Sequence, residues 1–332
     1  MQILTGDIGG TKTLLQRIAF QDGQWIEGPK QRYDSHAYPD LAPMVQAFLR
    51  DHPGPSPDTA CFAVAGPVHD GMARLTYLPW ELEQNRLQAQ LNIPRVRIIN
   101  DFEAIGYGIS TLLDSEYETL QAGQAVPGAI QVVLGAGTGL GQCIRIRKDE
   151  QYQVLATEGG HADFAPVNAE QIALLQHLLT QHERVSYDDL VSGKGLVRIY
   201  DFLCQDNPNK ENPQLRDQRI HQDAAATISE FALQHNDPLA NHALDMFVSI
   251  YGAQAGNLAL TALALGGVYI AGGIAPKILP KFHTGLFMQH FLAKSPMQHI
   301  IRNIPVHVIL NPEIGLRGAG AYLLAEHQLL PS

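Results

Sequence analysis

Three ionisable side chains gather in residues 154–163 around a pair of glycines: Glu158, His161 and Asp163. The spacing Glu-x-x-His can serve a metal site when it lies on a helix. Two adjacent glycines each cost a helix about 1 kcal/mol, so no helix is expected here. A carboxylate and an imidazole on a bent loop instead suit the hydroxyl groups of a small polyol. We therefore predict a polyol-binding loop, in which Asp163 has a structural role.

Two glycine-rich loops precede this stretch, at residues 7–12 (DIGGTK) and 135–141 (GAGTGLG). Neither fits the P-loop or the dinucleotide-binding fingerprint, whose glycines stand in another register. Glycines nevertheless expose backbone N–H groups, and successive N–H groups can form an anion-binding nest. Thr11 and Thr138 add hydroxyl donors. We predict that both loops hold the phosphates of a nucleotide, although either loop alone also fits a tight structural hairpin.

The carboxylate of Asp7 gives the first loop a ligand for Mg²⁺, most simply through water, because Mg²⁺ prefers oxygen ligands and keeps several waters. A third glycine pair, Gly272 and Gly273, follows an apolar run, and a flat base could pack there. An ordinary strand-to-helix turn fits this pair equally well. The residues predicted to bind the nucleotide and its ion are Asp7, Gly9, Gly10, Thr11, Lys12, Gly137, Thr138, Gly139, Gly272 and Gly273.

Asn100 and Asp101 stand at the end of a predicted strand, between the two glycine loops in the sequence. Phosphoryl transfer to a hydroxyl group needs positioning, charge neutralisation and an acceptor for the hydroxyl proton. An aspartate is ionised at pH 7 and can accept that proton late in the reaction. Asp101 fits this role, and it also fits a plain helix N-cap. Asn100 carries donors and acceptors that suit a sugar hydroxyl.

The elements that must position these residues follow an α/β pattern. A strand, a glycine loop and a second strand open the chain, and a similar unit opens near residue 131, which indicates a duplicated plan. Strands are expected at residues 3–4, 14–20, 25–33, 59–65, 96–99, 131–134, 142–147, 152–156, 267–271 and 306–309. Helices are expected at residues 41–49, 80–91, 102–113, 169–179, 222–234, 238–265 and 315–327.

Composition narrows the class of protein. The 332 residues exceed the usual size of one core, so two domains are expected. A net charge of −10, without a Lys/Arg run, argues against nucleic-acid and acidic-membrane partners. Three cysteines without a C-x-x-C pair argue against a disulfide framework or a zinc site. Residues 246–276 carry no charge, but polar residues and glycines divide them into a buried helix and a strand. No signal peptide is expected, so we predict a cytoplasmic protein.

With these residues in place, the chain resembles the bacterial glucokinases of the hexokinase/actin-like ATPase superfamily over nearly its whole length. The motifs that carry the resemblance are residues 6–11 (GDIGGT), 65–67 (AGP), 99–102 (INDF), 135–141 (GAGTGLG), 158–166 (EGGHADFAP), 271–274 (AGGI) and 315–320 (GLRGAG). The resemblance implies two α/β domains of ribonuclease H-like, actin-like ATPase fold with an interdomain cleft. The smaller domain would hold residues 1–112 and 303–332, and the larger one residues 113–302.

The resemblance also implies an activity, the ATP-dependent phosphorylation of D-glucose at the 6-hydroxyl group, which gives glucose 6-phosphate at the entry to glycolysis. It implies that Asp101 is the general base, that ATP·Mg²⁺ lies on the two glycine loops, and that Gly272 and Gly273 lie near adenosine. It further implies a homodimer. The sugar-binding residues would be Asn100, Asp101, Glu158, His161, Asp188 and Gly66.

Two departures from the family pattern stand in residues 185–195. The family has a sugar-binding glutamate where this chain has Asp188, which is one methylene shorter, and Lys194 replaces a proline. Other readings stay open: a kinase for fructose, mannose or an amino sugar, or a non-catalytic sugar sensor or an actin-like ATPase that acts on protein partners. The phosphoryl donor could be ATP, ADP or polyphosphate.

Overall fold

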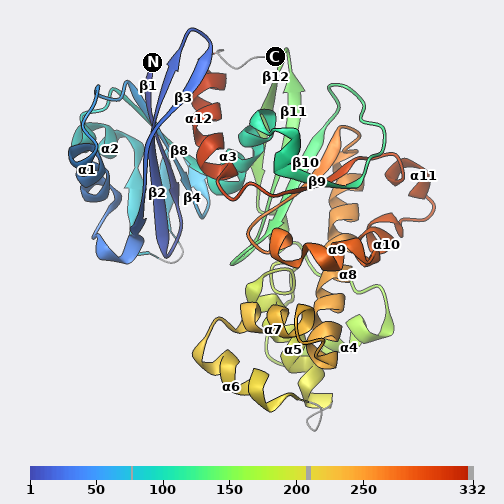
Figure 1. The fold of residues 1–332 in the computed structure, drawn as a ribbon. Coiled ribbons are helices and arrows are strands. Elements are labelled where there is room, and N and C mark those ends of the chain that lie inside the picture. Colours follow the sequence, from blue (N-terminus) through green and yellow to red (C-terminus); the bar gives the residue numbers. More distant parts are fainter. Residues whose placement is uncertain (76–77, 207–210, 328–332) are drawn as a thin grey trace. The chain divides into compact units, whose positions relative to one another are not determined.

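The computed structural model describes residues 1–75, 78–206 and 211–327 (Figure 1). Contacts between residues divide the chain into two compact units. The first unit holds Met1–Asp114, Arg145–Ala156 and Asn311–Ser332, and the second holds Ser115–Ile144 and Thr157–Leu310. The domain boundaries and the cleft expected from the sequence stay predictions.

The first unit is built on a five-stranded sheet of order β3-β2-β1-β4-β8. Its strands are β1 (Gln2–Ile8), β2 (Lys12–Gln21), β3 (Gln24–Asp34), β4 (Thr59–Val64) and β8 (Arg95–Asn100). Strands β1, β4 and β8 run parallel, and their register aligns Ile8, Val64 and Asn100 in one row. The segments that follow these three strands therefore start at the same edge of the sheet. These segments contain the first glycine loop, Gly66 and Asp101.

Side chains alternate between the two faces of this sheet, as the period of a strand requires. Leu4, Phe62 and Ile98 pack with helices α1 (Leu41–Asp51) and α2 (Gln84–Leu91). Ile3, Cys61 and Ile99 pack on the opposite face with α12 (Ile314–Glu326) and with Ala104 of α3 (Asp101–Gly108). Figure 1 shows α1 and α2 on one side of the sheet and α12 and α3 on the other. The side chain of Asp7 lies on the same face as Ile3, because Leu4 and Ile8, at the alternate positions of β1, lie on the other face.

Two predicted helices are corrected at their ends. The helix expected at residues 80–91 begins as strand β7 (Glu81–Glu83), which pairs with β6 (Met72–Arg74) in a small sheet completed by β5 (Val68–His69). Leu82 is buried between two exposed glutamates, which is the period of a strand rather than of a helix. The helix expected at 102–113 ends at Gly108 and continues as a short 3₁₀ turn, Ile109–Thr111.

A second sheet repeats the plan of the first. It has the order β12-β11-β10-β13-β14-β9, in which a hairpin again precedes parallel strands, so the duplicated plan is confirmed. Gly135 pairs with Ala271, which brings the ends of β10 and β13 to the same edge. The strands are β9 (Tyr117–Gln121), β10 (Gln131–Ala136), β11 (Leu140–Lys148), β12 (Gln151–Thr157), β13 (Gly267–Ala271) and β14 (Val306–Ile309).

The long helix α8 (Pro238–Ala262) forms the centre of the second unit's core. Its glycines permit close approach, because a Cβ added at Gly252 would lie 2.2 Å from the carbonyl oxygen of Phe287. None of the described helices combines the length and the apolar composition that crossing a membrane requires. The other helices are α4 (Ala169–Leu178), α5 (Gly193–Asp206), α6 (Pro213–His221), α7 (Ala224–Leu233), α9 (Leu279–His283), α10 (Leu286–Leu292) and α11 (Gln298–Ile301).

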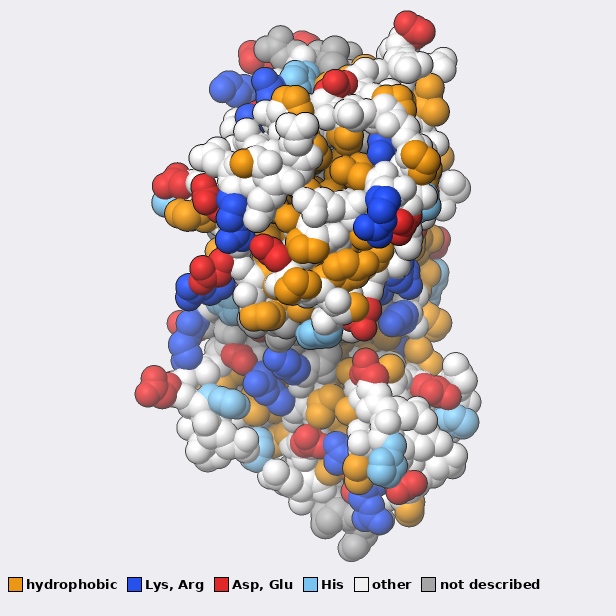
Figure 2. All heavy atoms as spheres, turned by 90° about the vertical axis from the view of Figure 1, so that its left-hand side faces the viewer, with side chains coloured by type: hydrophobic (Ala, Val, Ile, Leu, Met, Phe, Trp, Pro, Cys, Tyr) orange, Lys and Arg blue, Asp and Glu red, His pale blue; other side chains and the backbone are white. Residues whose placement is uncertain are grey.

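Charged side chains of both signs share the surface. Figure 2 shows one face on which Lys and Arg side chains are interspersed with Asp and Glu side chains. The net charge of −10 is therefore not accompanied by a concentrated basic area on this face.

Candidate functional site

The first glycine loop is held by a buried serine that sequence reasoning missed. The loop is a tight turn, in which the N–H of Gly9 donates to the carbonyl oxygen of Lys12 at 3.0 Å. The hydroxyl of Ser35 donates to the carbonyl oxygen of Gly9 at 3.0 Å, and the N–H of Ser35 donates to the carbonyl oxygen of Thr11 at 3.0 Å. Ser35 follows the end of β3, so only the tertiary pairing of β2 with β3 reveals its role.

Asp7 lies on β1 beside the first turn of α12. A Cβ built on Gly315 would lie 3.6 Å from Oδ2 of Asp7, so glycine leaves space next to this carboxylate. Burial raises the pKa of Asp7 to about 6, and the charge of Lys12 opposes that rise. The described residues contain no cluster of three or more metal-ligating side chains. A single carboxylate fits Mg²⁺, which proteins often hold with one carboxylate, waters and substrate phosphates.

Asn100, rather than Asp101, is the N-cap of α3. Its Oδ1 accepts hydrogen bonds from the backbone N–H groups of Phe102 at 2.9 Å and Glu103 at 3.2 Å. The prediction of Asp101 as N-cap is thus wrong by one residue, because the extended backbone of Asn100 ends the strand and starts the helix. The Nδ2 group of Asn100 also donates to the carbonyl oxygen of Gly66 at 3.0 Å. Asp101 is therefore the first helical residue. It directly follows Asn100, whose side chain is bonded both to α3 and to Gly66.

Glu158 and His161 lie at either end of one 3₁₀ turn, Gly159–His161. The N–H of His161 donates to the carbonyl oxygen of Glu158 at 3.0 Å, and the two side chains approach to 4.0 Å. The side chains of Glu158 and His161 are 62% and 60% exposed, so both can reach a ligand. Arg184 donates to the carboxylate of Asp163 and to the carbonyl oxygen of His161, which fixes the end of the turn.

The two glycines of this turn are required by close packing against β11. A Cβ at Gly160 would lie 1.9 Å from the carbonyl oxygen of Leu140, and one at Gly159 would lie 2.5 Å from Oε1 of Gln142. Leu140 belongs to the second glycine loop and is the first residue of β11. The polar turn and the second glycine loop are therefore neighbours within one unit.

The second glycine loop borders a cavity of about 580 Å³ in the second unit. The N–H of Gly193, at the start of α5, donates to the carbonyl oxygen of Gly137 at 2.9 Å. Thr138, Lys194 and Lys277 line the cavity together with Gly273. Apolar walls come from α5, α7 and the turn after β13, and include Val197, Ala224, Ala225, Ala226, Leu233, Ile274 and Ile278. The lining thus combines glycine backbone, the hydroxyl of Thr138 and two lysines with these apolar side chains, and it also includes the polar side chains of Asp223, Ser229, Glu230 and Gln234.

The two glycines predicted to bind the nucleotide after β13, Gly272 and Gly273, have different roles. Gly273 lines the cavity, and a Cβ at Gly273 would meet nothing within 4 Å. Gly272 has a φ of +83°, and a Cβ there would lie 2.4 Å from the carbonyl oxygen of Ala136. Gly272 therefore holds the backbone turn, and Gly273 faces the space where a ligand could lie.

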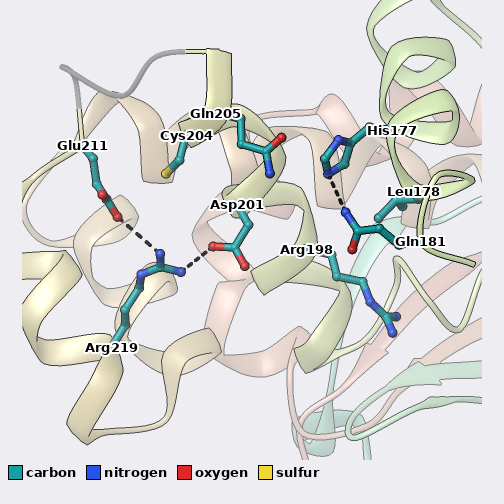
Figure 3. Close-up of a pocket in the computed structure, with 9 residues that line it drawn as sticks. All are labelled: His177, Leu178, Gln181, Arg198, Asp201, Cys204, Gln205, Glu211 and Arg219. Carbon is teal, nitrogen blue, oxygen red and sulfur yellow. Dashed lines mark hydrogen bonds and ion pairs between the residues drawn. The ribbon is translucent and has the colours of Figure 1, made fainter.

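A second cavity, of about 420 Å³, lies in the helical part of the same unit (Figure 3). Its two arginines are already paired, Arg219 with Asp201 and Glu211 and Arg198 with Asp189. None of the predicted site residues is among those described as lining this cavity. The pair formed by Arg198 and Asp189 instead anchors α5 to the segment that carries Asp188.

The structure assembles the predicted residues into two sets. Asp7, the first glycine loop, Gly66, Asn100 and Asp101 lie at one sheet edge of the first unit. Glu158, His161, Asp188 and the second glycine loop lie together in the second unit, beside the cavity that Gly273 lines. Sequence reasoning missed Lys277, which carried no motif, and it singled out Lys194 only as a departure.

The chain is similar to a family model, to curated relatives and to solved structures. A family model described as Glucokinase matches residues 4–326. A curated glucokinase of Nostoc sp. (strain PCC 7120) is 46% identical, over 96% of this chain and 97% of that relative. A crystal structure of glucokinase from an Antarctic psychrotroph is 30% identical, with a TM-score of 0.84 and coverage of 98% of this chain and 99% of that one.

A more distant structure extends the likeness of fold. A ROK family glucokinase from Streptomyces griseus, solved in complex with glucose and AMPPNP, is 20% identical, with a TM-score of 0.68. It covers 98% of this chain and 100% of its own. At that identity the likeness concerns the fold alone. The fold is the actin-like ATPase fold, so the fold class predicted from the sequence is confirmed.

Proposed function

We propose a mechanism from one premise: the chain belongs to the glucokinase family, and it is an enzyme that phosphorylates glucose with ATP. The observation that carries the mechanism is the placement of Asp101. It is the first residue of α3, at the edge where β1, β4 and β8 end, and Asn100 holds that position through the helix cap and Gly66. A carboxylate fixed at this edge can accept a proton from a hydroxyl group.

The reaction forms one bond and breaks one. The 6-hydroxyl oxygen of glucose attacks the γ-phosphorus of ATP, and the bond from that phosphorus to the β,γ-bridging oxygen breaks, so ADP leaves. The carboxylate of Asp101 accepts the hydroxyl proton as the new bond forms. The products are glucose 6-phosphate and ADP. Asp101 is thus the catalytic residue of the proposal.

We assign the binding of the sugar to polar groups that the family resemblance implies. We assign hydroxyl binding to Glu158 and His161, because their side chains are more than half exposed on a rigid turn. Gly66 and Asn100 contribute at the edge that carries Asp101. The amide of Asn100 is already engaged by α3 and Gly66, so its main effect is on the position of Asp101. Asp188 is left out of this set, because its carboxylate accepts a hydrogen bond from the backbone N–H of Leu140 at 2.6 Å.

We assign the donor to the cavity beside the second glycine loop, and the family resemblance implies that the first glycine loop also contacts its phosphates. The apolar walls of this cavity suit a purine base, and Gly137, Thr138 and Lys194 in its lining suit phosphates. Lys277 adds a second cation to its lining. Asp7 would hold Mg²⁺ through water, and the bound ion would neutralise charge on the phosphates. Gly9, Gly10, Thr11 and Lys12 would contact the phosphates from the first loop.

Sugar range and setting are proposals of their own. Glucose is the preferred sugar, and the enzyme works in the cytoplasm as a homodimer. The family resemblance supports each of these choices. A coupled assay of ADP release from ATP, with glucose, fructose, mannose and glucosamine compared at equal concentration, tests the first. We expect release that depends on glucose. Release without sugar, or equal release with every sugar, would contradict the proposal.

A further inference from the structure

Asp188 touches both the second glycine loop and the sugar-binding turn. Its Oδ1 accepts a hydrogen bond from the backbone N–H of Leu140 at 2.6 Å. Its own backbone N–H donates to the carbonyl oxygen of Gly160 at 2.8 Å. One residue therefore joins the first residue of β11 to the turn that carries Glu158 and His161.

The carboxylate of Asp188 packs closely against the second glycine loop. A Cβ built on Gly139 would lie 2.6 Å from Oδ1 of Asp188, so this glycine leaves room for the carboxylate. The segment that carries Asp188 is itself held, because Asp189 accepts hydrogen bonds from Ser186 at 2.9 Å and 2.7 Å and from Arg198 at 2.8 Å. The carboxylate of Asp188 thus comes from a fixed support and meets the loop at Gly139 and Leu140.

We propose that Asp188 is a positioning residue that holds the second glycine loop in its phosphate-binding shape and joins it to the sugar-binding turn. The loop offers backbone N–H groups to an anion only while its backbone keeps one conformation. A hydrogen bond to an ionised carboxylate is about twice as strong as a neutral one, and the backbone N–H of Leu140, within that loop, donates it. The inference rests on the proposed function, because it takes this loop as the donor site.

Two substitutions of Asp188 distinguish a role in positioning the loop from a role in sugar binding. Asp188→Asn keeps an oxygen that can accept from Leu140, whereas Asp188→Ala removes the acceptor. We expect Asp188→Ala to weaken ADP binding and raise the KM for ATP about tenfold, and Asp188→Asn to change both by less than about threefold. The KM for glucose should change little in either variant, because the bond to Gly160 comes from the backbone.

The experiment measures the Kd of ADP by calorimetry without sugar, and then both KM values. Glu183→Ala, which removes an exposed carboxylate nearby in the chain, is the matched control and should behave like the wild type. A rise in the KM for glucose in both Asp188 variants, with ADP binding unchanged, would make Asp188 a sugar ligand and overturn the proposal. Unchanged values in Asp188→Ala would also overturn it.

A second pair of variants keeps the test valid if Asp188→Ala folds poorly. Gly139→Ala places a methyl group against the carboxylate, so it should weaken ADP binding in the wild-type background. In an Asp188→Asn background the strain should be similar, and in Asp188→Ala, if folded, the further loss should be small. Unchanged ADP binding in Gly139→Ala in the wild-type background would overturn the contact, and so would a loss in the Asp188→Ala background, where it folds, as large as that in the wild type. Failure of the proposed function would appear separately, as a wild type that binds ADP but does not phosphorylate glucose.

Discussion

The side-chain amide of Asn100 donates to the carbonyl oxygen of Gly66 at 3.0 Å, while its oxygen caps α3. The bond joins the end of β8 to the segment after the neighbouring strand β4. Gly66 has a φ of 143°, which side chains on L-residues rarely allow. Asp101 follows Asn100 directly, so its backbone is fixed by the same two contacts.

Asn100→Ala should therefore lower kcat as well as stability. Losing the cap costs about 1 kcal/mol of unfolding free energy, and losing the bond to Gly66 frees the backbone next to Asp101. Asn168→Ala is the matched control, since Asn168 caps α4 through Gln171 at 2.9 Å and lies far from Asp101 in the sequence. We expect similar losses of stability in urea but a fall in kcat for Asn100→Ala alone. Equal kcat values in the two variants would contradict the positioning role.

Gly318→Ala should destabilise the first unit strongly. A Cβ at Gly318 of α12 would lie 1.8 Å from the carbonyl oxygen of Ala104, so α12 and α3 would have to separate. Overpacking of this kind costs about 1–3 kcal/mol. Gly54→Ala is the control, because its Cβ would meet only the Arg17 side chain at 3.7 Å. Thermal unfolding of both variants checks the prediction, and equal melting temperatures would refute it.

Much of this arrangement could be predicted from the sequence. The two strand–glycine loop–strand units predicted both sheets. They could be recognised because the alternation of apolar and polar residues and the positions of glycines are local features of the sequence. The N-cap at Asn100 was assigned one residue late, because Asn and Asp cap helices equally well and only the backbone distinguishes them. Ser35 and Lys277 were missed, because each meets its loop or cavity only through tertiary pairing.

Glu103 makes stability depend on pH. Burial raises the pKa of this carboxyl group to about 7 from 4.5. Burial raises the pKa of three neighbours, and the charge of Glu103 adds to each rise: Cys61 on β4, Tyr107 on its own helix and Tyr322 on α12. The unfolded chain ionises first, so stability should fall as pH rises from about 4.5 to about 7 and then stay level.

Glu103→Gln should flatten that part of the stability curve. The amide cannot ionise, so the unfolding free energy of the variant should lose less between pH 5 and pH 7 than that of the wild type. Glu83→Gln, at an exposed position, serves as the control and should keep the wild-type slope. Urea unfolding across this range measures the effect. A wild-type slope in Glu103→Gln would rule out the carboxyl group as its source.

Lys194→Gln and Lys277→Gln should each raise the KM for ATP by about threefold to tenfold without changing the KM for glucose. Both cations line the cavity assigned to the donor, and their attraction for phosphates falls as salt screens it. The effect should therefore shrink between low and high ionic strength. Lys148→Gln, at the exposed end of β11, is the control. A glucose KM that rises with the ATP KM would place the lysines elsewhere in the mechanism.

Asp101→Asn gives the most direct test of the whole mechanism. The amide keeps the size of the side chain but cannot accept the hydroxyl proton as a base. Loss of a general base costs about 10²-fold to 10⁴-fold in rate. Single-turnover formation of glucose 6-phosphate, with glucose binding measured by calorimetry on the same sample, separates chemistry from binding. We expect a rate at least about 100-fold below the wild type with glucose affinity within about threefold. A rate near that of the wild type would contradict the central claim that Asp101 is the catalytic base.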